Sequence, residues 1–349
     1  MKIILKNAIL ISERKELNEM NMKIRLGIIG AGWMSSMCCD AIAVTNNVEA
    51  YGVYARSLPK AKDFAEKYLI PFCTDDVNAL LQNKNIDAIY IATTNESHAQ
   101  FAMMAINAGK SVLLEKPFTL NHAQAKELQE AAKAKGCFVM EAMWSRFSPA
   151  MLSIAYLVKT EAIGHLRSIK IQTGCVLTKE KNARVYDKQL GGGALLDIGV
   201  YPLSIIQMIT GIHPVKVTNN MNTDNSTGVD VENTITLIYE NGLKAEVYVT
   251  CFKDLASTLV IEGSNGSIAC ENYVFAQSFT LENDNDSKYY NFTTAREPYT
   301  YQLEHFAHCI KQGKKDSYIM PLSSTLQVMK LLDEIRQVAG YYYPQEISI

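Results

Sequence analysis

Short apolar runs alternate with longer amphipathic segments over the first part of the chain, from Lys23 to Met143. The apolar runs have the length of buried strands, and the amphipathic segments repeat their apolar positions with a helical period. Strands that alternate with helices of this length predict a parallel sheet with helices on both faces. The predicted strands are Ile24–Ile29, Val48–Ala55, Ile86–Ala92, Ser111–Leu114 and Cys137–Met140, and the predicted helices are Met34–Thr45, Leu58–Tyr68, Asp76–Gln82, Glu96–Ala108 and His122–Lys135.

The pattern changes after Met143, where short apolar runs follow one another with fewer helices between them. Asn241-Gly242 lies between two of these runs and is a strong hairpin signal. The polar stretch from Asn219 to Asp230 predicts a loop. We therefore expect an α+β domain with a mainly antiparallel sheet, made of predicted strands Leu166–Thr173, Val215–Asn220, Thr234–Tyr239, Lys244–Cys251 and Ser257–Glu262 and closed by a helix Ser323–Val338.

The composition is that of an ordinary globular protein, and 349 residues are enough for two domains. The net charge of −2 gives no electrostatic reason to expect nucleic acid or a membrane surface as a partner. The eight cysteines form neither a CxxC pair nor a cluster with metal-ligand spacing, which predicts reduced thiols, no metal site and a cytoplasmic protein. Residues 1–22 do not resemble a signal peptide, so we expect an N-terminal extension there.

Two glycines lie between the first predicted strand and the first predicted helix. Gly30 permits a tight turn, and Gly32 lets the backbone approach a pyrophosphate. Trp33 and Met34 open the helix, where free backbone N–H groups and the positive end of the helix dipole favour an anion. A glycine pattern in this context predicts a dinucleotide site, although Ser35 replaces the third glycine of the usual pattern. The alternative is a glycine-rich turn without a ligand.

The residues after the second predicted strand distinguish the two nicotinamide cofactors. NAD-binding domains usually place a carboxylate there for the ribose 2′-hydroxyl, whereas this chain has Ala55, Arg56 and Ser57. A guanidinium can pair with a 2′-phosphate, which a carboxylate would repel. We therefore expect NADP(H) to be preferred, bound by Arg56 and Ser57, with NAD(H) as the alternative cofactor. The other interpretation of Arg56 is a solvated surface side chain.

Four motifs follow one another in an order that resembles the glucose–fructose oxidoreductase/inositol dehydrogenase family. They are the glycine turn, Thr93–His98, Glu115-Lys116-Pro117 after a core strand, and Gly191–Tyr201. The resemblance implies an α/β Rossmann domain with a parallel sheet over residues 23–143. It also implies an α+β domain with an open, mainly antiparallel sheet over residues 144–349, which binds the substrate.

In this family the open sheet often forms the subunit interface, so the resemblance implies a homodimer. The last residues, Tyr341–Pro344, are a further candidate for packing at that interface.

The resemblance also assigns roles within the motifs. Lys116 is the catalytic lysine, placed beyond the carboxyl end of a parallel strand, where ligands of such sheets bind. A cis peptide bond is expected between Lys116 and Pro117. Thr94, Asn95 and His98 would lie beside the nicotinamide ribose, with Thr93, Glu115 and Lys116 in the same set of cofactor contacts. The alternative for His98 is a residue at the helix start without a ligand contact.

Asp197 and Tyr201 are four residues apart, so on a helix they share one face. Many family members carry histidine at the position of Tyr201 as the group that transfers the proton. A phenol can take this role if a neighbouring cation such as Lys116 lowers its pKa. Asp197 would then orient a substrate hydroxyl. The alternative for Tyr201 is a buried packing side chain.

The tyrosine, together with Met140–Phe147, resembles the branch of dimeric dihydrodiol dehydrogenases and NADP-dependent xylose dehydrogenases. Trp144, Arg146 and Phe147 would line the substrate pocket, and the alternative is an interdomain packing cluster. We therefore expect an NADP(H)-dependent oxidoreductase that transfers a hydride to or from the carbinol carbon of a sugar, a cyclic polyol or a trans-dihydrodiol. The alternative function is a non-catalytic dinucleotide-binding sensor of the same fold.

Overall fold

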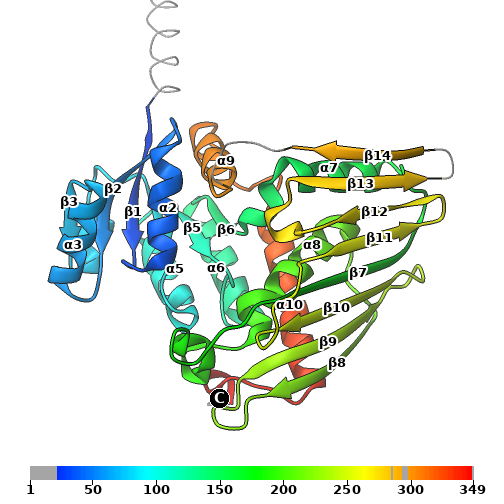
Figure 1. Ribbon diagram of the computed structural model, residues 1–349. Helices are drawn as coiled ribbons and strands as arrows, with labels where there is room; N and C mark the ends of the chain where they lie inside the picture. Colours follow the sequence, from blue (N-terminus) through cyan, green and yellow to red (C-terminus); the bar gives the residue numbers. More distant parts are fainter. Residues whose placement is uncertain (1–21, 284–285, 293–297, 348–349) are drawn as a thin grey trace, which may run out of the picture.

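The computed structural model describes residues 22–283, 286–292 and 298–347 and contains two sheets (Figure 1). The predicted extension over residues 1–22 lies outside the described residues, apart from Met22. Within the described chain, six parallel strands form the first sheet, in the order β3-β2-β1-β4-β5-β6. The strands are β1 (Ile24–Ile29), β2 (Val48–Tyr54), β3 (Phe72–Thr74), β4 (Ala88–Ile91), β5 (Ser111–Glu115) and β6 (Val139–Ala142).

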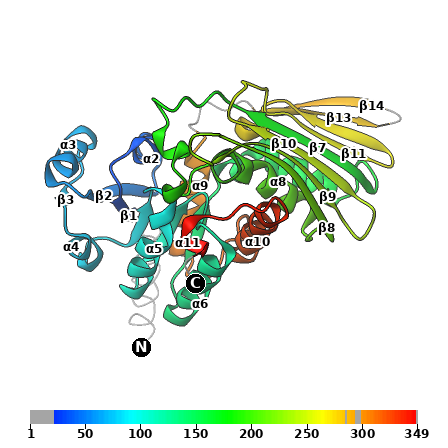
Figure 2. The ribbon, with the colours of Figure 1, turned by 90° about the horizontal axis from the view of Figure 1, so that it is seen from below.

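Helices cover both faces of this parallel sheet, as the alternating pattern predicted (Figures 1 and 2). Local signals set their ends. The Asn121 side chain accepts a hydrogen bond from the Gln124 N–H at the start of α6, and Gly136 ends α6 in the left-handed conformation. The helices are α2 (Trp33–Ala43), α3 (Leu58–Tyr68), α4 (Val77–Gln82), α5 (His98–Asn107) and α6 (His122–Lys135).

The second sheet has the order β14-β13-β12-β11-β7-β10-β9-β8 among the described residues. Its neighbouring strands are antiparallel except for the parallel pair of β7 and β10, which confirms the predicted mainly antiparallel sheet. The hairpin at Asn241-Gly242 is also confirmed, because it joins β9 to β10. The strands are β7 (Leu166–Gly174), β8 (Lys216–Thr223), β9 (Asp230–Ile238), β10 (Lys244–Thr250), β11 (Leu259–Gly263), β12 (Gly266–Cys270), β13 (Ser278–Asn283) and β14 (Asp286–Asn291).

The predicted loop from Asn219 to Asp230 is wrong in part. Strand β8 continues to Thr223, and β9 already begins at Asp230. β8 is the edge strand of the sheet, and its side chains alternate between half-buried and exposed positions. An edge strand needs few apolar side chains, so its polar sequence resembled that of a loop.

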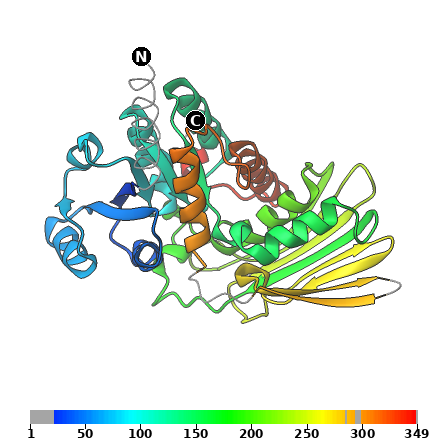
Figure 3. The same ribbon diagram turned by 90° about the horizontal axis from the view of Figure 1, so that it is seen from above.

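The C-terminal helices connect the two domains. Helix α10 packs against α8 and β8 and also against α6 and β6 of the first domain, while α9 packs against α2 and β2 (Figures 1 and 3). The helices of this part are α7 (Pro149–Lys159), α8 (Val200–Thr210), α9 (Thr300–Lys311), α10 (Leu322–Val338) and α11 (Pro344–Ile347).

One described helical stretch, Lys188–Thr210, is long and apolar enough to cross a membrane by composition. The most apolar 18-residue window of this stretch is 78% buried inside the protein. This stretch is the central helix of the second domain, and burial against the sheet accounts for its apolar sequence.

Candidate active site

The glycine turn between β1 and α2 has the predicted geometry. Gly30 has a φ of 106°, and a Cβ there would lie 2.5 Å from the Ala92 carbonyl oxygen, so only glycine fits. A Cβ on Gly32 would meet no atom within 4 Å. Ser35 is buried and its hydroxyl donates to the Gly30 carbonyl at 2.6 Å, which fastens the turn to the helix.

The start of α2 fits the pyrophosphate of a dinucleotide. Gly32 at the N-cap offers no side-chain acceptor, and the first turn contains no acidic residue. The first N–H groups of the helix therefore have no side-chain cap, and they lie at the positive end of the helix dipole. Trp33 is exposed and Met34 is half-buried at the start of this helix.

Arg56 and Ser57 are exposed directly beyond the carboxyl end of β2. Ser57 is the N-cap residue of α3, and Ala55 before them is buried. The Arg56 side chain is thus free to reach a ligand at this edge of the parallel sheet. Its contact with a 2′-phosphate stays a prediction.

Lys116 lies at the carboxyl end of β5 and contacts Asp197 from the second domain. The Lys116 Nζ donates to the Asp197 backbone oxygen at 2.5 Å and lies 3.4 Å from Asp197 Oδ1. Arg184 donates to the same Oδ1 at 3.0 Å. Burial alone would raise the pKa of the Asp197 carboxyl, but the two neighbouring cations outweigh burial and lower it. Asp197 is therefore a carboxylate at neutral pH.

Tyr201 also lies beside Lys116. The Lys116 Nζ is 4.9 Å from the centre of the Tyr201 ring, and the Trp144 Nε1–H donates to the Tyr201 hydroxyl at 3.1 Å. Asp197 belongs to a π-helical turn, Leu195–Gly199, that runs into α8, where Tyr201 is in the first turn. The structure thus brings Lys116, Asp197 and Tyr201 together, as the sequence predicted for one pocket.

The expectation that Lys116 lowers the pKa of Tyr201 is wrong. Burial raises the pKa of this phenol, and the nearby Glu115 carboxylate raises it further. Lys116 contacts the face of the ring rather than the hydroxyl oxygen, so its charge does not offset the loss of water. Tyr201 therefore keeps its proton at neutral pH.

The three glycines before Asp197 are required by close packing. A Cβ on Gly192 would collide with backbone carbonyl oxygens, and one on Gly193, where φ is 123°, would collide with the Asp230 carboxylate. The Asn95 Nδ2 donates to the Gly191 carbonyl at 2.8 Å, and the Tyr343 hydroxyl donates to the Gly192 carbonyl at 2.8 Å. These contacts fix the point from which the helix carrying Asp197 begins.

The prediction that Tyr341–Pro344 pack at a subunit interface is wrong for two of the three tyrosines. Tyr341 and Tyr343 are buried inside the subunit, and only Tyr342 between them is exposed. Tyr341 and Tyr343 are thus unable to contribute to a subunit interface through their side chains.

The residues expected beside the nicotinamide ribose also support the turn after Lys116, whose bond to Pro117 is cis as predicted. His98 is buried, with Nδ1 2.8 Å from the Pro117 oxygen and Nε2 3.3 Å from the Thr93 oxygen. Burial lowers the pKa of His98 to about 4, so its imidazole is neutral. Thr94 donates to Glu96 at 2.6 Å.

Glu115 lies below Lys116 and is buried. It accepts a hydrogen bond from the Tyr90 hydroxyl at 2.7 Å, and burial raises the pKa of its carboxyl to about 7. Its contact with a cofactor stays a prediction.

Trp144, Arg146 and Phe147 follow β6 in the 3-10 turn η2 (Trp144–Phe147), and all three are buried. Trp144 lies beside Tyr201 and packs on Phe275 and Tyr299 with ring centroids 4.6 Å and 5.0 Å away. By contrast, Arg146 NH1 donates to Gln207 on α8 at 3.1 Å.

Phe147 packs on His305 of α9, with ring centroids 5.2 Å apart. Of these three side chains, the structure therefore brings Trp144 to the Lys116 site, while Arg146 and Phe147 lie in the packing between η2 and the helices.

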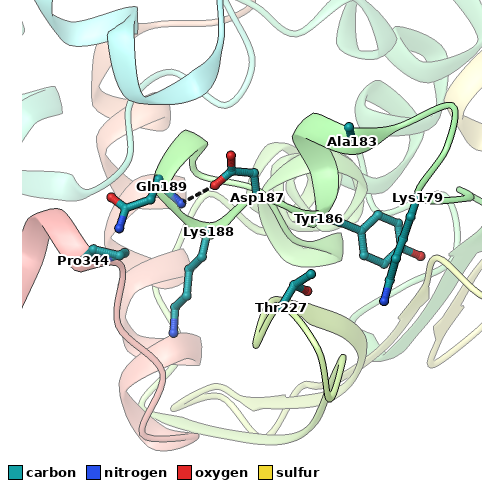
Figure 4. A pocket seen from close by; sticks show the side chains of 8 residues that line it. All are labelled: Lys179, Ala183, Tyr186, Asp187, Lys188, Gln189, Thr227 and Pro344. Carbon is teal, nitrogen blue, oxygen red and sulfur yellow. Dashed lines mark hydrogen bonds between the residues drawn. The ribbon is translucent and has the colours of Figure 1, made fainter.

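Sequence reasoning missed Arg184. It lies in the 3-10 turn η3 (Ala183–Tyr186), in a charged segment without periodicity, where no pattern distinguished it from surface residues. Neighbours of Arg184 in this segment line an open cavity of about 620 Å³, which Arg184 itself does not line (Figure 4). Lys179 and Lys188 stand at its two sides, and neither Lys116 nor Asp197 lines it.

Comparison with known proteins places this fold and site in a family. The profile of the oxidoreductase family with an NAD-binding Rossmann fold matches residues 24–143, and that of the GFO/IDH/MocA C-terminal domain matches residues 151–269. A trans-1,2-dihydrobenzene-1,2-diol dehydrogenase of Xenopus tropicalis is 32% identical, with 93% of this chain and 100% of that protein covered. The human enzyme of this name is 28% identical, with 93% and 99% covered.

Two solved structures share the fold. An aldose–aldose oxidoreductase from Caulobacter crescentus, complexed with glycerol, has a TM-score of 0.84 at 23% identity, covering 91% of this chain and 98% of that one. A levoglucosan dehydrogenase, in complex with NADH and levoglucosan, has a TM-score of 0.83 at 20% identity, covering 91% and 98%.

Fold and site together define a two-domain nicotinamide-dependent oxidoreductase. The chain belongs to the GFO/IDH/MocA oxidoreductase family, which confirms the predicted resemblance and the predicted fold class. It is an NAD(P)-dependent enzyme that acts on CH–OH groups. Its full-length relatives named above are dihydrodiol dehydrogenases.

Proposed function

We propose that this enzyme is an NADP(H)-preferring dehydrogenase of a small polyhydroxylated compound, a sugar, a cyclic polyol or a trans-dihydrodiol. The observation that carries the proposal is the contact of Lys116 with Asp197 and Tyr201 at the carboxyl edge of the parallel sheet. Relatives named as dihydrodiol and levoglucosan dehydrogenases and an aldose–aldose oxidoreductase support this substrate class.

The cofactor would bind across this edge, with its pyrophosphate at the start of α2. Gly30 allows the tight turn, Gly32 leaves the backbone open there, and no side chain caps the helix. When bound, a nicotinamide cofactor supplies hydride transfer at its C4 atom.

Lys116 would transfer the proton. In the direction of carbonyl reduction, its ammonium donates a proton to the oxygen that becomes the alcohol, and in oxidation the same nitrogen accepts it. Asp197 orients this ammonium through its backbone oxygen and Oδ1. The Asp197 carboxylate can also accept a hydrogen bond from a neighbouring hydroxyl of the substrate.

Tyr201 would position the reacting oxygen. Its own oxygen accepts the Trp144 N–H, and none of the described residues accepts the Tyr201 hydroxyl proton. That proton is therefore available to a substrate oxygen. Because burial raises the pKa of Tyr201, this phenol acts as a hydrogen-bond donor and not as a base.

The preference for NADP(H) rests on Arg56. It is exposed at the carboxyl end of β2 beside Ser57, where a carboxylate is absent from the sequence. A 2′-phosphate at this place would pair with the guanidinium.

We also propose a cytoplasmic homodimer. Helices α7, α8 and α10 pack against one face of the second sheet, and among the described helices none covers the other face (Figures 2 and 3). All eight cysteines are free thiols, which suits a reducing compartment. Light scattering on the purified protein would measure twice the chain mass, and a monomer at micromolar concentration would contradict the dimer.

The near-ultraviolet absorbance of reduced nicotinamide tests the function. The enzyme is mixed with NADP+ or NAD+ and with aldoses, inositols or trans-diols in turn. Faster reduction of NADP+ than of NAD+ by at least one compound is the expected result. If NADPH binds but no compound in the panel is turned over, the proposed substrate class fails.

A further inference from the structure

We propose that Arg184 binds an anionic group of the substrate, so that the site selects hydroxy compounds that carry a carboxylate or a phosphate. The inference rests on the proposed function, because it names the substrate class of the same site. It is carried by the position of Arg184, by the charges around it and by the donors that it leaves free.

Arg184 is more exposed than the two charged side chains beside it. Its NH2 donates to Asp197 Oδ1 at 3.0 Å, but 49% of its side chain is exposed, against 10% for Asp197 and 10% for Lys116. The Arg184 guanidinium is therefore more accessible to a ligand from solvent than Lys116 or Asp197.

Most of the hydrogen-bonding capacity of Arg184 is unused. A guanidinium has five N–H donors in a planar fork. Within residues 22–283, 286–292 and 298–347, its bond to Asp197 is the one hydrogen bond that its side chain makes. A carboxylate or phosphate can take two of the remaining donors at once, which a single hydroxyl cannot do.

The charges around the site favour an anion. Lys116 and Arg184 share the carboxylate of Asp197, and burial raises the pKa of the one further carboxyl beside Lys116, that of Glu115, to about 7, so the second positive charge is compensated only in part. The segment from Lys179 to Gln189, which carries Arg184, has four basic residues and two acidic ones. An excess of positive charge at a site attracts anionic ligands.

Holding Asp197 in place does not require Arg184. Lys116 already donates to both the backbone oxygen and Oδ1 of Asp197. A half-exposed ion pair adds little stability, about 1 kcal/mol or less. Ligand recognition is thus the role that explains a second cation at this carboxylate.

Isothermal titration calorimetry of the NADPH-saturated enzyme tests the inference. The ligands are D-glucose, D-glucuronate and D-glucose 6-phosphate, which share the ring and differ in the group at C6. We expect at least one anion to bind about 10- to 100-fold more tightly than glucose, as one charge-assisted pair allows. Tighter binding of D-glucuronate would indicate a carboxylate substrate, and tighter binding of D-glucose 6-phosphate would indicate a phosphorylated one.

Three variants separate the role of Arg184 from general charge. Arg184→Gln should abolish the preference for the anion over glucose, and Arg184→Lys should keep most of it. Lys181→Gln removes an exposed charge from the same segment and should leave the preference unchanged. Melting temperatures check that each variant is folded.

Equal affinities for glucose and both anions, no measurable binding of either anion, or a preference that survives Arg184→Gln would each overturn the inference. These outcomes differ from failure of the proposed function. An enzyme that binds the anion through Arg184 but transfers no hydride to or from any compound in the panel would refute the proposed function alone.

Discussion

Replacement of Lys116 by methionine tests the proposed chemistry directly. Methionine keeps an unbranched side chain that can pack on the Tyr201 ring, but it removes the charge and the three donors. Both hydrogen bonds from Lys116 to Asp197 are lost. Arg184 still pairs with the Asp197 carboxylate at 3.0 Å, so this buried charge keeps a partner and the fold is retained.

The size of the effect depends on what else could move the proton. A guanidinium keeps its proton in proteins, and burial raises the pKa of Tyr201, so neither Arg184 nor Tyr201 can replace Lys116. General acid–base catalysis contributes about 10²- to 10⁴-fold, equivalent to ~3–5 kcal/mol. We therefore expect kcat to fall by at least about 10²-fold with Kd for NADPH changed by less than about threefold.

The assay measures turnover of the best substrate of the panel and NADPH binding by fluorescence on the same preparations. Lys126→Met is the matched control, because Lys126 lies exposed on α6 and its Nζ is 3.9 Å from Glu130. Turnover of the Lys116 variant at more than about a tenth of the parent value would remove Lys116 from proton transfer. A parallel loss of NADPH affinity would show instead that Lys116 mainly binds the cofactor.

Three further substitutions test other parts of the structure. Arg56→Asp should weaken NADPH binding about 10- to 100-fold and leave NADH binding nearly unchanged, and equal effects on both, measured by fluorescence titration, would contradict the 2′-phosphate contact. Gly193→Ala should lower the free energy of unfolding by about 2–4 kcal/mol, because of its φ of 123° and the collision with Asp230. Gly211→Ala is the matched control, because φ is 66° there but a Cβ meets nothing within 4 Å, and it should lower the free energy of unfolding by about 1 kcal/mol. Equal losses of unfolding free energy for the two variants in urea would refute the packing argument. Burial raises the pKa of the Glu141 carboxyl from 4.5 to about 7. Between these two pH values the folded state keeps a proton that the unfolded state has released, so the free energy of unfolding falls as the pH rises. Glu141→Gln should reduce this pH-dependent loss of unfolding free energy by up to about 3 kcal/mol. An unchanged slope of unfolding free energy between about pH 5 and about pH 8 would contradict the prediction.

Most of the first domain could be predicted from its sequence because its longer elements have clear local signals, whereas the three-residue strand β3 was too short for one and was not predicted. Helix α6 lies within the predicted bounds of His122 and Lys135, with Asn121 and Gly136 as its capping residues. The strands of the second sheet at its far end were not predicted. β13 alternates half-buried with buried residues only over its first four positions, and β14 is exposed except at Tyr290. Both strands contain many polar residues, so their stability comes from pairing with neighbouring strands rather than from their own pattern.

The candidate site could also be predicted only in part. The resemblance to the family indicated Lys116, and the four-residue spacing placed Asp197 and Tyr201 on one helix face; the structure brings the three together. The sequence could not indicate that Arg146 points into the packing beside α8, or that Arg184 reaches Asp197 from a segment without periodicity. Both facts depend on the direction of one long side chain, which is set by tertiary contacts.

The geometry around Lys116 depends on contacts that neither domain makes alone. Lys116 comes from the parallel sheet, whereas Asp197 and Tyr201 come from the helix that follows the three glycines. Asn95 of the first domain and Tyr343 of the C-terminal segment each bind a carbonyl oxygen of this glycine turn at 2.8 Å. Because the turn has no side chains, its neighbours rather than its own packing decide where the helix begins. The distance between Lys116 and the Asp197 carboxylate is therefore set by both domains and by the C-terminal segment together.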